Sequence, residues 1–195
     1  MKKIFYLLLA CLFIISVNAR AQDTTSYLKA GQLKANLNYL GGSLSYEAKI
    51  SQSNTLYFDA GIGLGVTYQS TFYTNTGTTY YQYAWRTALA AEFRHYYHFK
   101  YRSDNGKDIA NNSSNFFALH SNYIFKPLSS SGNADHSSVV SLMPAWGIQR
   151  TIGKNFSFEL ELGLQASYEL TKYQPSSTQF TVGPGTVVKI GHVLK

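Results

Sequence analysis

The sequence predicts an all-β fold: one antiparallel, up-and-down barrel of about eight strands. Of its 195 residues, 45% are hydrophobic and 15% aromatic, but only 14% are charged, against about 25% in ordinary soluble domains. Polar and apolar residues alternate along several segments, as in strands whose successive side chains point to opposite faces. Links rich in Gly, Asn and Ser separate these segments. The composition also excludes a disordered chain and a coiled coil.

The N-terminus predicts a cleaved signal peptide, residues 1–21, ahead of a single domain at 22–195. Two lysines near the start precede an apolar stretch, Ile4–Ser16, and the small residues Ala19 and Ala21 have the spacing that signal peptidase reads. The apolar stretch is shorter than the roughly 20 residues that a membrane-spanning helix needs. The expectation is therefore export, with cleavage after Ala21.

Cleavage would also change the charge and cysteine counts. Cys11 is the single cysteine and lies in the predicted signal, so the mature chain would have neither disulfides nor a cysteine nucleophile. The net charge falls from +7 to +4, with 14 basic and 10 acidic residues left. The basic residues form no run, and an exported protein does not meet nucleic acid. Nucleic acid is therefore not expected as a partner.

The strands follow from the alternation. It is clearest from Asn155 to Tyr168, where the even positions are apolar or aromatic and the odd positions polar or small. The predicted strands are Leu33–Leu40, Ser43–Ile50, Leu56–Tyr68, Trp85–Phe99, Asn115–Phe125, Val139–Gln149, Asn155–Tyr168 and Val182–Leu194. An even number of strands is typical of bacterial outer-membrane barrels made of one chain.

The links between strands alternate in length. Gly41–Gly42, Ser51–Asn54 and Thr151–Asn155 are predicted tight turns. The longer polar links are Ser70–Tyr83, Lys126–Ser138 and Thr171–Thr181, which fall at one end of the barrel. Long outer loops and short periplasmic turns are the usual asymmetry. The charged link Lys100–Ser114 breaks this rule, and the sequence offers no physical reason for its length.

Strand parity assigns ten charged residues to the polar face. This face is too rich in Gly, Ala and Ser to be a good water-facing shell, so we expect it to line the lumen and the apolar face to meet lipid. The inward charges are Lys34, Glu47, Lys49, Asp59, Arg86, Glu92, Arg94, Glu159, Glu161 and Lys189. An eight-stranded barrel is just wide enough for its side chains. We expect these charges to pair and fill the lumen, with a narrow proton or ion path as the alternative.

Aromatic residues gather near the ends of the predicted strands, on the apolar face. They are Tyr39, Tyr46, Tyr68, Trp85, Tyr97, Phe99, Tyr123, Phe125, Phe156 and Tyr168. Amphipathic rings at these positions predict an aromatic girdle at the two lipid–water boundaries.

These features together resemble the small eight-stranded outer-membrane β-barrels of Gram-negative bacteria, of the OmpA, OmpX and OmpW type. The resemblance covers nearly all of the mature chain and is one of architecture. Residues 189–194 resemble the last-strand insertion signal, although Lys195 follows Leu194 where an aromatic residue is usual. The resemblance to this family implies a monomer in the outer membrane. It also implies contact with membrane lipid and lipopolysaccharide, and insertion by the barrel assembly machinery.

The sequence shows no catalytic set and no metal site, and we expect no cofactor. His95 and His98 would point to opposite faces of one strand, and His120 lies on a separate segment. His120 and Ser121 are adjacent and would point apart, whereas a serine hydrolase needs them within hydrogen-bond reach of each other. An enzymatic role is therefore not the expected one.

The sequence thus favours a structural or loop-mediated interaction role. The predicted loop Ser70–Tyr83, rich in Tyr, Thr and Ser, is the expected contact surface for an unknown partner. Two alternatives remain: a lipid-modifying barrel enzyme, resembling the lipid A deacylases and acyltransferases, and a soluble exported ligand carrier with its apolar face inward.

Overall fold

The computed structural model describes residues 27–38, 40–73, 76–131, 137–170 and 179–194. The predicted signal peptide, with Ala19 and Ala21, lies outside the described residues, as does Tyr39. Among the described residues, no helix is long and apolar enough to cross a membrane.

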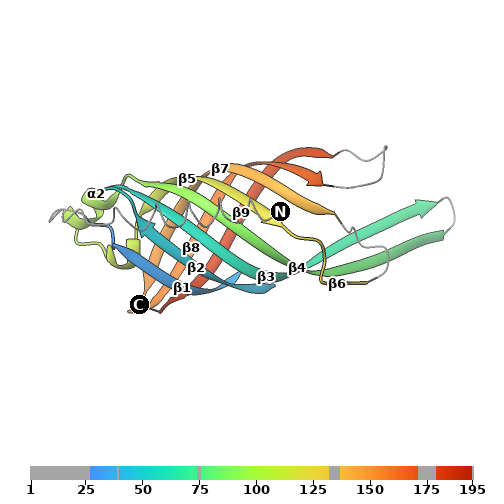
Figure 1. Ribbon diagram of the computed structural model, residues 1–195, viewed down its shortest axis with the longest axis horizontal. Helices are drawn as coiled ribbons and strands as arrows, with labels where there is room; N and C mark the ends of the chain where they lie inside the picture. The colour runs from blue at the N-terminus through green and yellow to red at the C-terminus, as the bar shows by residue number, and fades with distance from the viewer. Residues whose placement is uncertain (1–26, 39, 74–75, 132–136, 171–178, 195) are drawn as a thin grey trace, which may run out of the picture.

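The described chain forms one antiparallel sheet of nine strands, and eight of them close into a ring (Figure 1). In chain order, the ring contains β1 (Gly31–Asn38), β2 (Gly41–Lys49), β3 (Asn54–Tyr73), β4 (Thr76–Tyr96), β5 (Asn115–Ile124), β7 (Ser138–Ile152), β8 (Phe156–Leu170) and β9 (Phe180–Val193). Each strand pairs with its neighbour in this order, and β9 pairs back with β1. The short β6 (Ser129–Ser130) pairs with β4 beside the ring. The prediction of an all-β, up-and-down arrangement of eight strands is confirmed.

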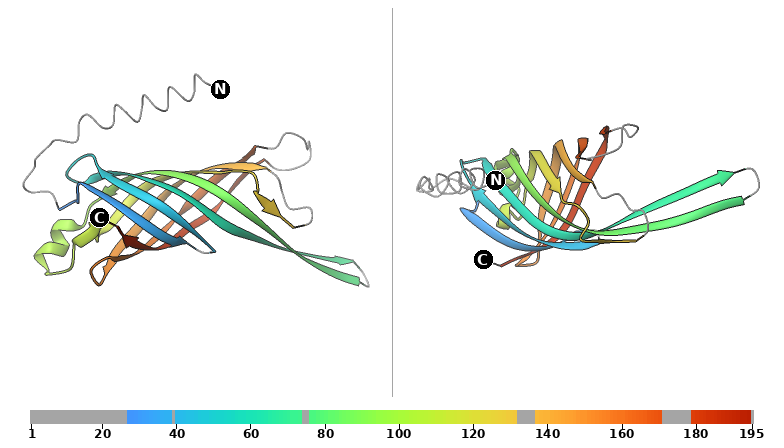
Figure 2. Two further views of the ribbon diagram at one scale, coloured as in Figure 1. Left: turned by 60° about the horizontal axis from the view of Figure 1, so that its bottom comes forward. Right: turned by 45° about the vertical axis from the view of Figure 1, so that its right-hand side comes forward.

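The prediction that Ser70–Tyr83 forms a loop is wrong. β3 runs on to Tyr73 and β4 begins at Thr76, and the two strands stay paired up to these residues. The hairpin projects beyond the ring, at the end opposite helix α2 (Phe99–Asp104) (Figures 1 and 2). Its polar composition suggested a loop, but Tyr and Thr favour strands, and the two strands satisfy each other's backbone groups.

The first predicted turn, Gly41–Gly42, is also displaced. Both glycines belong to β2, and Gly41 pairs with Asn38, so the chain reverses before Gly41. A side chain on Gly41 would overlap the backbone oxygen of Ile62 in β3. The glycine is thus needed because β3 approaches closely, not because the chain turns there.

The long link after β4 folds into a cap over one end of the ring. It contains α2 and the 3-10 turn η1 (Ala110–Asn112). Phe99, predicted as an outward girdle residue, instead begins α2 and is only 5% exposed, with its ring 5.2 Å from that of Tyr96. The strand ends at Tyr96, earlier than predicted, so the parity rule no longer applies at Phe99.

Hydrogen bonds attach this cap to distant parts of the chain. The backbone N–H of Lys29 donates to Oδ1 of Asn112 (2.9 Å), and Nε2 of Gln149 donates to the carbonyl oxygen of Asn111 (2.5 Å). Both asparagines have positive φ, a conformation that Asn tolerates better than most residues. The length of the link Lys100–Ser114, unexplained by the sequence, thus serves to close one end of the ring.

The ring is polar inside and apolar outside. On β8, Ser157, Glu159 and Glu161 are buried, whereas Phe156 and Leu162 are exposed. The same holds on the other strands: the largest fully buried side chains include Arg94, Lys34, Glu47 and Glu92. Among the described residues, 32 large hydrophobic side chains are exposed. This is the reverse of a water-soluble domain, whose core is apolar.

Candidate functional site in the lumen

Eight of the ten predicted inward charges meet in one network inside the ring, which we call the lumen network. Its members are Lys34, Glu47, Asp59, Glu92, Arg94, Glu159, Glu161 and Lys189. Two predicted members lie apart from it: Lys49 is half-buried at the end of β2, and Arg86 is half-buried and donates to the carbonyl oxygen of Ser137 (2.8 Å).

Arg94 is the centre of this network and is fully buried. Its guanidinium lies 2.5 Å from Glu92, 2.8 Å from Glu159 and 3.1 Å from Glu161. With Glu159 it forms a two-pronged pair of 2.8 and 2.9 Å, the geometry in which Arg binds carboxylates most strongly. Its flat faces contact aromatic rings, 3.7 Å from the ring centre of Tyr57 and 4.7 Å from that of Phe116.

Two lysines on other strands, Lys189 of β9 and Lys34 of β1, also belong to the network. Lys189 lies 3.4 Å from Asp59 and 3.6 Å from both Glu92 and Glu159, and donates to the hydroxyl of Tyr57 (3.2 Å). Lys34 lies 3.6 Å from Glu47.

Glu47 is held by its neighbours on the inner wall as well. Its Oε1 accepts hydrogen bonds from Tyr96 (2.6 Å) and Thr55 (2.8 Å). Buried charges are tolerated when they are paired and hydrogen-bonded in this way.

Strand register accounts for these contacts. Glu92 and Arg94 are two residues apart on β4 and so share the inward face. Glu159 of β8 lies directly opposite Lys189 of β9. Residues far apart in the sequence therefore meet because the ring brings their strands to the same level.

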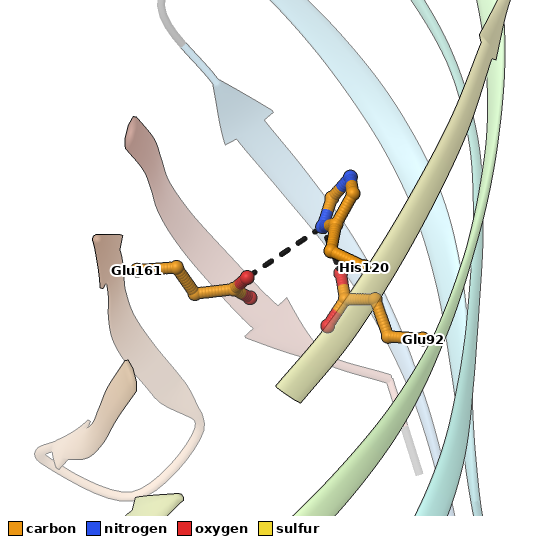
Figure 3. Close-up of side chains that lie close together, drawn as sticks. All are labelled: Glu92, His120 and Glu161. Carbon is orange, nitrogen blue, oxygen red and sulfur yellow. Dashed lines mark ion pairs between the residues drawn. The ribbon is translucent and has the colours of Figure 1, made fainter. Parts of the chain in front are cut away.

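His120 is a member of the site that the sequence prediction missed. Its Nδ1 lies 3.0 Å from Oε1 of Glu92 and 3.5 Å from Oε2 of Glu161 (Figure 3). On β5 its register partner is Glu92. Strand parity could have placed it there, because the apolar Phe117 and Leu119 alternate with His120 and lie on the outer face, which puts His120 on the inner face.

The predicted aromatic girdle residues lie mostly on the outside. Those exposed are Tyr46, Trp85, Tyr97, Phe125, Phe156 and Tyr168. Tyr123 is half-buried, and the side chain of Tyr68 lies outside what the structure describes. Trp146, which the prediction omitted, is also exposed and donates to the hydroxyl of Tyr97 (2.8 Å).

The lumen has two unlike halves. The half next to α2, which we call the closed half, is filled by side chains that are 0% exposed: Gln32, Tyr57, Arg94, Phe116 and Gln149. The half toward the β3–β4 hairpin, the open half, has inward residues that are partly exposed, and several of them are small: Gly63, Ala88, Ala90, Asn122 and Gln165. His120 lies between the two halves, with 9% of its side chain exposed.

The described residues do not place His120 and Ser121 together for hydrolysis. Ser121 donates to the carbonyl oxygen of Ala91 (3.0 Å) and lies on the outward side of β5. The chemistry concentrated in the lumen is instead that of carboxylates, one imidazole and buried cations. The chain matches no protein-family model, no curated protein and no solved structure.

Proposed function

We propose that the protein is an outer-membrane β-barrel with a structural or loop-mediated interaction role and a lumen filled by side chains. The observation that carries this proposal is the inverted distribution of residues: charges inside the ring and large hydrophobic residues outside it. Lipid is the solvent in which such an outer face is favourable, because exposed apolar surface costs about 25 cal/mol per Å² in water.

A soluble ligand carrier would need the opposite arrangement. Such a carrier holds its ligand in an apolar cavity and presents polar residues to water. In this ring, the inward face carries the lumen network and the outward face carries residues such as Leu44, Phe93 and Leu164. Soluble monomers rarely expose apolar patches larger than a few hundred Å². The distribution therefore favours the membrane over the soluble alternative.

The filled lumen and the projecting hairpin support the second part of the proposal. In the closed half Arg94 contacts the rings of both Tyr57 and Phe116, which favours a plugged ring over an open pore. The β3–β4 hairpin extends past the ring and is rich in Tyr and Thr. A two-stranded extension of this composition is suited to contacts with other molecules.

Electrophoresis of the unboiled membrane fraction tests the proposal. We expect the protein in the outer-membrane fraction, as a compact band that moves to its full apparent mass after boiling. A soluble periplasmic protein processed in parallel provides the fractionation control. Recovery of the chain with that control protein, with no change of mobility on boiling, would refute the proposal.

A further inference from the structure

One group of side chains in the lumen is arranged as metal ligands are. Oε1 of Glu92, Nδ1 of His120 and Oε2 of Glu161 all lie within 4.8 Å of one another, with Nδ1 3.0 and 3.5 Å from the two oxygens. Ligands of a tetrahedral zinc ion, bound at about 2.0–2.2 Å, are separated from each other by about 3.3–3.5 Å. The two separations that involve His120 are therefore close to the spacing that such an ion requires.

These same three atoms are buried and have no hydrogen-bond partner outside their own group. Nδ1 of His120 lies between Oε1 of Glu92 and Oε2 of Glu161, and Nζ of Lys189 lies 3.6 Å from Oε1 of Glu92, whereas the other oxygen of each carboxylate accepts a hydrogen bond from Arg94. Buried polar atoms are usually satisfied, so an unsatisfied group of three pointing at one place needs an explanation. The side chains come from three strands and converge (Figure 3).

Arg94 occupies the other oxygen of each carboxylate. It contacts Oε2 of Glu92 (2.5 Å) and Oε1 of Glu161 (3.1 Å), while the oxygens Oε1 and Oε2, respectively, face His120. In metal sites, outer groups orient the ligating carboxylates in this way. Lys189, 3.6 Å from Oε1 of Glu92, keeps Asp59, Glu159 and the hydroxyl of Tyr57 as partners if an ion takes that oxygen.

The charge of the network matches a divalent cation. The lumen network has five carboxylates and three basic groups, Lys34, Arg94 and Lys189, so two negative charges are in excess when all eight are charged and His120 is neutral. Excess charge in a poorly solvated interior is costly unless a counter-charge is present. A divalent ion between Glu92, His120 and Glu161 would supply that charge.

We propose that Glu92, His120 and Glu161 bind a divalent transition-metal ion in the middle of the lumen. Imidazole together with two carboxylates is a donor set for Zn²⁺, Mn²⁺ or Fe²⁺. The ion reaches the site from the open half, since His120 is the most exposed of the three ligands and the inward residues beyond it include the small Ala88, Ala90 and Gly63. This inference rests on the lumen alone and does not depend on the location of the protein.

Zinc binding to the folded, tag-free protein tests the site. The protein is stripped with a chelator, dialysed against dilute Zn²⁺ and analysed by mass spectrometry of its metal content, with Mn²⁺ in a parallel sample. We expect about one ion per chain and a higher temperature for the electrophoretic shift, because an ion bound to the folded state stabilises it. His120→Ala and Glu161→Gln should each lower the affinity at least about tenfold, as lost ligand-shell groups do.

His95→Ala is the matched control. His95 is exposed on β4, and its Nδ1 lies 2.8 Å from Oδ1 of Asn54, away from the lumen. Zinc binding should be unchanged in this variant, and the electrophoretic shift checks that every variant is folded. Failure of the folded wild-type protein to retain Zn²⁺ or Mn²⁺ would overturn the proposal. Retention that is unaffected by both His120→Ala and Glu161→Gln would also overturn it.

Discussion

The two halves of the lumen differ although one set of strands forms both. In the closed half, long inward side chains such as Arg94 and Gln149 are fully buried. In the open half, the same strands contribute Ala88, Ala90 and Gly63, which are partly exposed. The backbone pairing is continuous through both halves, so the difference lies in the size of the inward residues. Residue size on alternate positions thus decides whether a ring of this width is plugged or accessible.

Arg94→Ala is the change expected to disrupt the closed half most. It leaves the buried carboxylates of Glu92, Glu159 and Glu161 without their shared cation. Removing one partner of a buried ion pair costs about 3–5 kcal/mol of folding free energy. The temperature of the electrophoretic shift measures this loss, and Lys49→Ala, at the half-buried rim, is the control. Unchanged stability together with altered single-channel conductance would mean that Arg94 lines a path and is not part of a plug.

Two glycine substitutions compare the halves directly. A side chain on Gly147, in the closed half, would overlap the ring of Phe116, whereas one on Gly63, in the open half, would meet nothing within 4 Å. Overpacking a filled interior costs about 1–3 kcal/mol, so Gly147→Ala should lower the unfolding temperature. Gly63→Ala should stay within about 0.5 kcal/mol of the wild type. Denaturant titration of both variants measures the two changes in the free energy of unfolding. Equal changes would contradict the distinction between the halves.

Two alanine-to-cysteine changes should affect stability least and test access. Ala90 is partly exposed on the inward face of β4, and Ala118 is 8% exposed on the inward face of β5 in the closed half. Cys11 is the single cysteine of the chain and lies in the predicted signal peptide, so each variant would carry one thiol after cleavage. A water-soluble thiol reagent should label the Ala90→Cys variant in the folded protein. It should label the Ala118→Cys variant only after unfolding. Labelling of both in the folded state would mean that water reaches the whole lumen.

Alternation was enough to predict which residues point inward. A period of two needs no knowledge of neighbouring strands, so Glu92, Arg94, Glu159 and Glu161 could be assigned to the lumen from the sequence. Which of them touch depends on the stagger of one strand against the next, which a single sequence does not encode locally. Parity alone would have placed His120 on the inward face, but its contacts with Glu92 of β4 and Glu161 of β8 depend on that stagger.

The other departures have local causes. Ser70–Tyr83 looked like a loop because it is polar and its sequence shows no regular alternation of polarity, yet its residues up to Tyr73 and from Thr76 pair as strands. Phe99 looked like the end of a strand, but the chain leaves β4 at Tyr96 and turns inward to cap the ring. That turn is stabilised by contacts with Tyr96, with Tyr27 near the start of the described chain and, through Asn111, with Gln149 of β7, which no local pattern could indicate.

The pairing that closes the ring joins the first strand to the last. Lys34 of β1 lies opposite Val193 of β9, and the N–H of Leu194 donates to the carbonyl oxygen of Leu33 (2.8 Å). Contacts so distant along the chain form slowly, because the entropy of closing the intervening loop must be met first. A chain shortened before β9 would keep two unpaired strand edges, which invite aggregation. Pairing of β9 with β1 and β8 therefore removes both open edges of the ring at once, and a chain that lacks β9 cannot close the ring.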